Sequence, residues 1–212
     1  NSSGFYWLHD IYADHVASAN GMALTAFGAY GYCAGQGNVA YSDVIEQGLS
    51  NLLTTCFQAA PVSTGQCRYN PDSNSNGLGI HILDTADQNY EMYEMGSVMT
   101  ALVSLGHPDD NAPASALDGI RNRSYFNIVQ DMVDYCAWAQ TDDGVGRGGW
   151  RYSANYASSD NSASWWPVTG MHAAETWDGI VIPEGLRDEL AYWVAYSQDA
   201  NGSFGYEGAS SP

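Results

Sequence analysis

Apolar side chains recur at helical spacing in several segments of the chain, and loops rich in Gly, Ser and Asn separate these segments. The pattern is clearest over roughly 43–58, 125–140 and 184–198, where apolar residues fall three and four positions apart and so share one face of a helix. These faces are Ile45, Leu49, Leu52, Leu53 and Cys56; then Phe126, Val129, Val133, Cys136 and Ala137; then Leu186, Leu190, Trp193, Val194 and Ser197. The pattern predicts three amphipathic helices.

A second, self-similar pattern precedes each of these helices. It is centred on Gly21, Gly96 and Gly170, which are 75 and 74 positions apart and lie in stretches of similar sequence. It predicts three further helices over roughly 10–30, 86–105 and 162–177, whose small residues allow neighbouring helices to approach closely. We therefore expect one all-α domain over 1–212, built from three helical hairpins with repeats at about 1–79, 80–148 and 149–212. Plain loops are expected over 61–79 and 141–161.

The charge balance narrows the range of partners. The chain has 24 acidic residues, six Arg and no Lys, which gives a formal net charge of −18. Such a charge repels phosphate backbones and anionic membranes, so nucleic acid is excluded as a partner and cations such as calcium are favoured. No apolar run is long enough to span a bilayer. The chain starts at Asn1 rather than Met, which is typical of a processed or partial chain.

The four cysteines indicate an oxidising compartment. An even count in an acidic chain without Lys favours disulfides, and we expect Cys56 to pair with Cys67 and Cys33 with Cys136. The alternative is four buried thiols. Three Asn-x-Ser sequons, at Asn1, Asn122 and Asn201, are candidate glycosylation sites. An extracellular, secreted protein is the expectation.

Aromatic residues gather after the second and third helices of the amphipathic set. Gln140 is followed by Gly149 and Trp150, and Gln198 by Gly202 and Phe204, with a fainter copy at Gln58, Gly65 and Tyr69. This pattern resembles the QW repeat of the terpenoid cyclase and protein prenyltransferase superfamily, and the bacterial prenyltransferase and squalene oxidase repeat proteins in particular. The resemblance implies an α/α toroid-like array, here a partial ring of three helical hairpins stapled by disulfides, in which the Gln caps a helix end while the aromatic ring packs back on it.

The catalytic motifs of that superfamily are not intact. Zinc-dependent prenyltransferases carry an Asp-x-Cys, whereas the matching residues are Asp160, Asn161 and Ser162, and Asp134-Tyr135-Cys136 lies on the wrong helix. No zinc is therefore expected. The Asp-x-Asp-Asp acid of the cyclases is also absent, since neither Asp84-Thr85-Ala86-Asp87 nor Asp142-Asp143 has its spacing.

Two acidic patterns remain as candidate sites. One helical face is predicted to carry four carboxylates: Asp84, Asp87, Glu91 and Glu94. These carboxylates could supply a general acid or hold a divalent cation, and the alternative is a solvated acidic face. Asp72, Asn74 and Asn76 precede Gly77 with the spacing of the first half of a calcium loop, although Leu83 replaces the final Glu. Calcium binding there competes with a simple Asn-rich turn.

Three functions from different classes follow. The first is a non-catalytic extracellular module that binds a partner or self-associates into an oligomer or filament, because three hairpins leave two uncapped apolar ends. The second is an enzyme whose acid-lined cavity acts on a polysaccharide or an isoprenoid, with His15 or His172 as further site candidates. The third is a carbohydrate-binding module that stacks sugars on Trp150, Tyr152, Trp165 and Trp166, unless these rings are buried. Partners would then be a second copy, another extracellular protein or a glycan.

Overall fold

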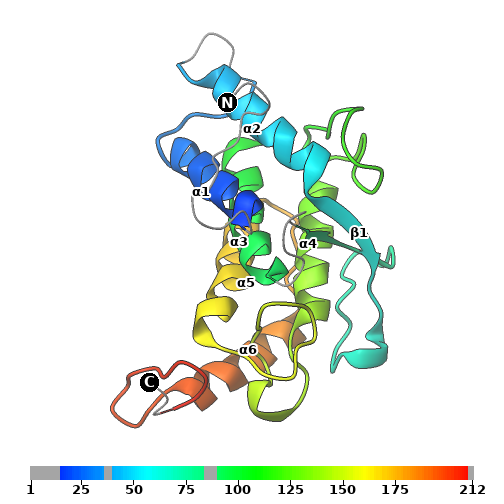
Figure 1. Cartoon of the computed structure of the whole chain (residues 1–212). Coiled ribbons are helices and arrows are strands. Elements are labelled where there is room, and N and C mark those ends of the chain that lie inside the picture. The colour runs from blue at the N-terminus through cyan, green and yellow to red at the C-terminus, as the bar shows by residue number, and fades with distance from the viewer. Residues whose placement is uncertain (1–14, 36–39, 84–89, 210–212) are drawn as a thin grey trace.

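The computed structural model describes residues 15–35, 40–83 and 90–209 (Figure 1). Its regular elements in chain order are α1 (Val16–Ala29), α2 (Ser42–Thr55), β1 (Phe57–Pro61), η2 (Thr64–Gln66), β2 (Leu78–Ile82), α3 (Glu91–Leu105), α4 (Tyr125–Ala139), η3 (Gly144–Gly146), α5 (Asn161–Ala174) and α6 (Glu184–Ser197). The helices α1 to α6 correspond to the predicted six. The described part of the chain is therefore helix-rich, and the prediction of its helices is confirmed, although residues 10–14 of the first predicted helix and 86–89 of the third lie outside it.

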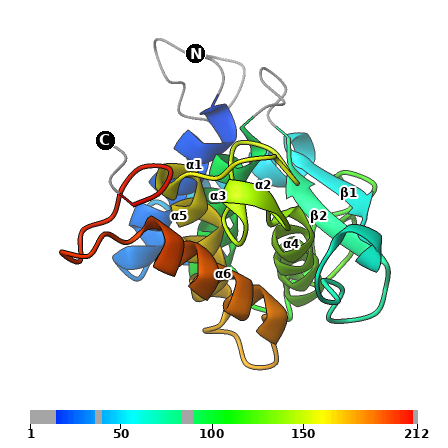
Figure 2. The ribbon, with the colours of Figure 1, turned by 90° about the horizontal axis from the view of Figure 1, so that it is seen from below.

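A small antiparallel sheet was not predicted. Strands β1 and β2 pair from Phe57 with Ile82 to Pro61 with Leu78. Ile80 and Ile82 are fully buried, and β2 packs on α4 (Figure 2). The prediction of an all-α protein with a plain loop over 61–79 is wrong here. Five-residue strands carry too short an apolar pattern to be recognised alone, and they gain their stability from packing on a helix.

The helices α1, α3 and α5 form a central stack in which α3 contacts both of the others (Figure 1). The aligned glycines lie in these contacts. A Cβ on Gly21 would meet the Ser97 carbonyl carbon at 2.8 Å, and a Cβ on Gly96 would meet the Trp166 carbonyl oxygen at 2.0 Å. Only a hydrogen at these positions lets the helix backbones touch, which explains the repeat of Gly at a fixed period.

The C-terminal end of α4 has all four of its terminal carbonyl groups paired. The Trp150 indole N–H donates to the Cys136 carbonyl at 2.9 Å, and the Tyr69 hydroxyl donates to the Ala137 carbonyl at 2.9 Å. The Cys67 thiol and the Asn155 backbone N–H reach the carbonyls of Trp138 and Ala139. These contacts satisfy the acceptors that a helix end leaves free. They also make fully buried Trp150 an anchor of the core.

Gln140 joins that helix end to the next hairpin. Its amide group donates to the carbonyls of Gly148 at 2.9 Å and Leu186 at 3.3 Å, and its Oε1 accepts from the Tyr69 hydroxyl at 2.7 Å. Trp150 thus packs back on the end of α4 as predicted, whereas the side chain of Gln140 donates to carbonyls outside α4, so the prediction that this Gln caps the helix end is wrong. Gln58 lies on β1 rather than at a helix end.

Neither predicted disulfide is present, and all four cysteines are free thiols in the structure. Cys56 ends α2, and the extended strand β1 then carries the chain roughly 16 Å away before it turns toward Cys67. Cys136 is fully buried on α4, whereas Cys33 follows α1, and α3 packs against both of these helices. Within residues 15–35, 40–83 and 90–209, no helix is long and apolar enough to cross a membrane.

Candidate functional site

An apolar groove of about 710 Å³ lies between α5 and α6. Its walls include Trp165 and Val168 from α5, Leu190 and Val194 from α6, and Phe204 and Tyr206 from the segment after α6. Buried Trp193 donates its indole N–H to Asn161 Oδ1 at 2.9 Å, which fixes α6 against the start of α5. None of the described residues that line the groove carries a formal charge. The groove is therefore suited to apolar side chains and not to an ion.

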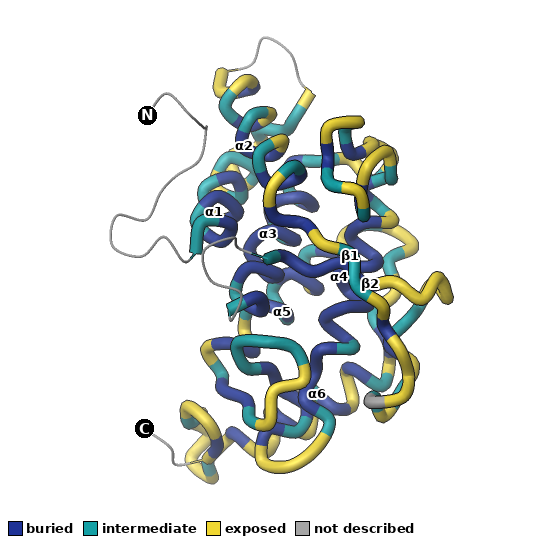
Figure 3. Tube along the Cα trace, turned by 45° about the vertical axis from the view of Figure 1, so that its right-hand side comes forward, coloured by how far each residue is buried: buried dark blue, intermediate teal, exposed yellow. Residues whose placement is uncertain are grey.

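Large apolar side chains of this groove face the solvent. Trp165 is 64% exposed and Phe204 is 54% exposed, whereas Trp150, which follows α4 as Phe204 follows α6, is 0% exposed. The difference follows from position, because the loop of Trp150 is packed between α4 and α6. Figure 3 shows that α3 and α4 are mostly buried, whereas the segment after α6 is largely exposed. In the described chain, the α6 end of the array thus leaves its apolar residues uncovered.

The four aromatic residues predicted to bind sugars do not form one platform. Trp150 is buried in the core, which is the alternative that the sequence left open. Tyr152 and Trp166 both lie beside Tyr93, with ring centroids 5.9 Å and 6.2 Å from it. Trp165 alone of the four lines the α5–α6 groove. Buried Trp150 therefore cannot stack a sugar, and carbohydrate binding by the other three residues stays a prediction.

The predicted calcium loop lies against α4. The carboxylate of Asp72 accepts the backbone N–H groups of Asn76 and Gly77, so it organises the loop itself. The side-chain amides of Asn74 and Asn76 both point at Asp131 Oδ1, at 2.7 Å and 2.9 Å. Asp131 was not predicted to be part of this site.

Two buried carboxylates of α4 face this loop. Asp131 is 0% exposed, and its Oδ2 is paired with the Arg123 guanidinium at 2.5 Å. Asp134, one turn further along α4, is also 0% exposed, and its Oδ1 accepts from the Gln130 amide at 3.0 Å. Burial raises the pKa of Asp134 to about 7, and nearby Asp131 adds to the rise against hydrogen bonds from Gln130 and Ser73. Among the described residues, no donor has hydrogen-bond geometry toward Asp134 Oδ2.

The predicted acidic face is only partly visible, since Asp84 and Asp87 lie outside the described residues. Glu91 is buried, and its carboxylate contacts His81 Nδ1 at 2.9 Å, the Tyr135 hydroxyl at 3.0 Å and the Ala154 backbone N–H at 2.5 Å. The hydrogen bonds of Glu91 join α3 to β2 and α4.

Glu94 is 1% exposed. Its carboxylate contacts His15 Nδ1 at 2.9 Å and the Ser18 backbone N–H. Both described carboxylates of the face are therefore held by protein donors, and for them the prediction of a solvated acidic face is wrong. Their arrangement fits buried carboxylates that link elements of the core.

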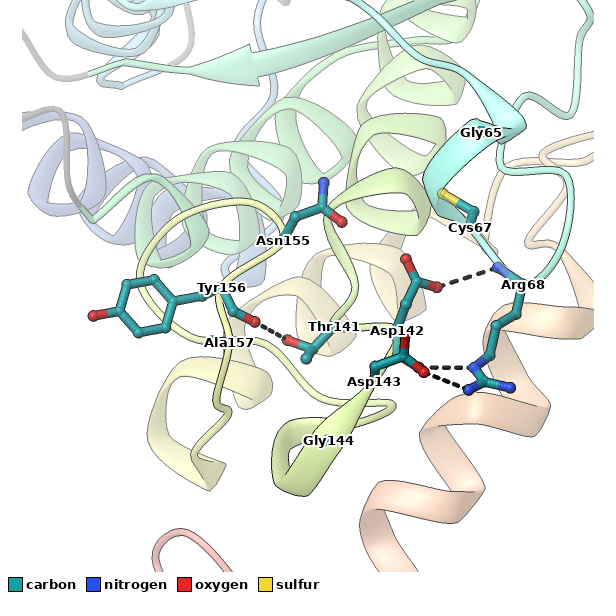
Figure 4. A pocket seen from close by; sticks show the side chains of 10 residues that line it. All are labelled: Gly65, Cys67, Arg68, Thr141, Asp142, Asp143, Gly144, Asn155, Tyr156 and Ala157. Atoms are coloured by element: carbon teal, nitrogen blue, oxygen red, sulfur yellow. Dashed lines mark hydrogen bonds and ion pairs between the residues drawn. The ribbon is translucent and has the colours of Figure 1, made fainter.

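A second, polar pocket of about 720 Å³ lies where the loop after α4 meets the loop before β2 (Figure 4). Arg68 crosses one side of it and donates to the Asp142 carbonyl at 2.7 Å and to the Asp143 carboxylate at 2.6 Å. Burial raises the pKa of the Cys67 thiol to about 12, and Asp142 adds to the rise. Cys67 is accordingly a poor nucleophile, and the pocket offers polar contacts rather than covalent chemistry.

The residues that match the zinc-binding position of prenyltransferases instead begin α5. Asp160 Oδ1 accepts from the Ala163 backbone N–H at 2.6 Å and from the Ser162 hydroxyl at 2.7 Å, so Asp160 is a helix N-cap. His172 is exposed on α5, 3.6 Å from Glu175. Of the sequons, Asn122 and Asn201 are exposed, and Asn1 lies outside the described residues.

Comparisons identify no relatives: no family model, no curated protein and no solved structure matches the chain. The interpretation of the groove, and of the contacts around Asp131, therefore depends only on the geometry described above. Sequence reasoning missed Leu190 and Val194 as residues that line a groove because their spacing is also that of a core face. It missed Asp131 although one signal was available, since Asp131 and Asp134 are the two charged residues of helix α4, which is mostly buried.

Proposed function

We propose that this protein is a non-catalytic extracellular binding and assembly module, a partial α/α toroid that stacks end to end with further copies of itself through the α5–α6 groove. The observation that carries the proposal is the exposed, uncharged groove, in which Trp165 and Phe204 remain open to solvent. Exposed apolar surface of this kind marks interaction sites in proteins. The acidic composition without Lys supports the extracellular location.

The opposite end of the stack supplies a matching surface. Helix α1 has no Asp, Glu, Lys or Arg, and its Met22 is 49% exposed. Helix α5 likewise has none of these four residues. In a chain with a formal net charge of −18, contact between two copies is favourable only where like charges are kept apart. The neutral helices at the two ends of the central stack meet that condition, and in the proposed stack α1 of one copy enters the groove of the next.

Stacking of this kind is heterologous, because two different surfaces of the chain meet, and repetition gives an oligomer or an open filament. The test is molecular mass by light scattering over a wide range of protein concentrations. We expect the mass of the wild-type protein to rise with concentration above the 22.8 kDa of one chain. Trp165→Ser in the groove and Met22→Asp on α1 should each abolish the rise. Tyr156→Ser removes an exposed aromatic ring that lies outside both surfaces and should leave the rise unchanged.

A mixture of the two deficient variants provides the sharpest measurement. The Trp165→Ser chain keeps an intact α1, and the Met22→Asp chain keeps an intact groove, so together they should form a dimer that cannot grow further. A mixture that stays monomeric while the wild type assembles would contradict end-to-end stacking. A wild-type protein that is monomeric at every concentration would rule out self-association and leave the groove to a different, apolar ligand.

A further inference from the structure

The polar pocket of about 720 Å³ beside the end of α4 is not used by the proposed assembly (Figure 4). It is lined by the loop before β2, the loop directly after α4 and the loop before α5. Each loop contributes a polar side chain, and Cys67, Asp142 and Asn155 point toward one space between the three loops. A concave site with a few convergent polar groups is typical of places where proteins bind a ligand.

The pocket holds a carboxylate oxygen that no protein donor reaches. Asp142 Oδ1 accepts the Arg68 backbone N–H at 3.2 Å, and no hydrogen bond within the described chain reaches the other oxygen of this carboxylate. The side-chain amide of Asn155 likewise has no hydrogen-bond partner among the described residues, whereas its backbone N–H donates to the Ala139 carbonyl at 2.9 Å. Two side chains of the pocket therefore have oxygens available to a ligand that donates hydrogen bonds.

The carboxylate of Asp142 also lacks a cation of its own. The Arg68 guanidinium pairs with the Asp143 carboxylate at 2.6 Å and donates to the Asp142 backbone carbonyl, so its charge is already matched by Asp143. Burial raises the pKa of Asp142, chiefly against the hydrogen bond from the Arg68 backbone N–H. A cation in the pocket would offset the cost of burying this charge. The end of α4 lies directly before this loop, and the negative end of a helix also favours cations.

We propose that the pocket binds the primary ammonium group of an external ligand, with Asp142 as its charged acceptor and Asn155 Oδ1 as its neutral one. An ammonium group is a point charge with three donors, so it suits a carboxylate with one oxygen available, whereas a guanidinium group is matched best by two parallel oxygens. The chain contains no Lys, so no side chain of a second copy supplies this group. The formal net charge of −18 attracts cationic ligands to the protein.

The test is isothermal titration of the full chain with n-butylammonium chloride, in sodium chloride at about 0.1 M to screen distant charges. This probe has the ammonium group and the four-carbon stem of a Lys side chain. We expect one saturable site per chain, and 1-butanol, which has the same stem without the charge, should not bind. Absence of butylammonium binding, or equal binding of 1-butanol, would overturn the proposal.

Two charge variants separate the pocket from general attraction to an acidic protein. Asp142→Asn should weaken butylammonium binding by about tenfold or more, because it removes the charged acceptor, and it keeps an oxygen for the Arg68 backbone N–H. Asp118→Asn is the matched control, since it removes the same charge from a side chain that is 91% exposed and lies outside the pocket. It should bind as the wild type does. Equal loss in the two variants would overturn the proposal.

Asn155→Gly tests the neutral acceptor without disturbing the backbone. Asn155 has a φ of 52°, in the left-handed region that Gly adopts without strain. The backbone N–H at this position still donates to the Ala139 carbonyl, and circular dichroism checks that the fold is kept. We expect butylammonium to bind roughly threefold or more weakly. Unchanged affinity would contradict the role of Asn155.

Two further probes distinguish the sources of the ammonium group. The diamine 1,5-diaminopentane represents a free alkylamine, and Nα-acetyl-lysine methylamide represents a Lys side chain within a protein. Binding of the diamine alone would support a small-molecule ligand, whereas binding of both probes would support a Lys side chain of a partner. None of these results bears on the α5–α6 groove, whose variants are different.

Discussion

At the scale of residues, the close packing of α1, α3 and α5 depends on glycines that have no side-chain carbon. At Gly96 a methyl group would lie 2.0 Å from the Trp166 carbonyl oxygen, and the nearest neighbours are backbone atoms that cannot rotate away. The contact between α3 and α5 therefore depends on the absence of a side chain at this position. The same holds for Gly21 between α1 and α3, although with somewhat more room.

Gly96→Ala should lower the free energy of unfolding by about 1–3 kcal/mol or more, because the two helices must separate to admit the methyl group. Urea unfolding followed by circular dichroism measures the change. Gly65→Ala is the matched control, since the only nearby atom there is Ser63 Oγ at 4.0 Å. Equal stability of the Gly96→Ala variant and the wild type would show that α3 and α5 do not touch as described.

Cys67 gives a second test at the scale of one residue. Burial raises the pKa of its thiol to about 12, and Asp142 contributes to the rise. Only the thiolate reacts with iodoacetamide, so at pH 8 Cys67 of the folded protein should be alkylated roughly a thousandfold more slowly than in the unfolded chain. Peptide mapping by mass spectrometry gives the rate. Alkylation as fast as in urea would mean that the loop does not bury this thiol.

At the scale of elements, α6 is held to the loop after α4 by one ion pair. Arg147 donates to the Glu189 carboxylate at 2.6 Å and 2.9 Å, and its guanidinium also lies 4.3 Å from the centre of the Tyr192 ring. The hydrogen bonds from Arg147 lower the pKa of Glu189, against the opposing effect of burial. Because α6 forms one wall of the groove, this pair also positions the proposed docking surface.

The lowered pKa of Glu189 predicts a pH dependence with a definite sign. A carboxyl group whose pKa is lower in the folded state stabilises the fold above its unfolded pKa, and this contribution is lost as pH falls through the folded pKa. Glu189→Gln should therefore be less stable than the wild type at pH 7, and the difference should begin to shrink near the unfolded pKa of about 4.3 and disappear only when the pH falls below the lowered pKa of folded Glu189. Thermal unfolding over this range measures it, with exposed Glu184→Gln as control. A difference that persists unchanged at low pH would contradict a charge-dependent contact.

At the scale of the whole molecule, association has to overcome a formal net charge of −18 on each copy. Added salt shortens the range of repulsion from about 10 Å at 0.1 M to about 3 Å at 1 M, while it leaves contact between neutral surfaces intact. We therefore expect the mass measured by light scattering to increase with sodium chloride at fixed protein concentration. Self-association that weakens as salt is added would indicate charged contacts and would contradict stacking through α1 and the groove.

Local sequence patterns were sufficient to predict the helices and the regular spacing of the glycines at which the helices of the central stack touch. The faces of α2, α4 and α6, the glycines at 21, 96 and 170, and the return of Trp150 to the end of α4 depend on residues close together in the chain. Their signal is local because a helix repeats every 3.6 residues and a helix end leaves the same acceptors free wherever it occurs. The resemblance to toroid proteins remains a prediction.

Only the tertiary structure decided which of these residues face solvent and which distant residues meet. The sequence by itself determined that Glu91 and Glu94 share a helix face, but the fold surrounds them with His81, Tyr135 and His15 and thereby buries them. The fold also forms the strands β1 and β2, leaves all four cysteines as free thiols, exposes Trp165 and brings Asp131 to the 72–77 loop. The physical reason is that burial and pairing between distant segments depend on how elements pack, and the periodicity of one segment carries no information about the segment that covers it.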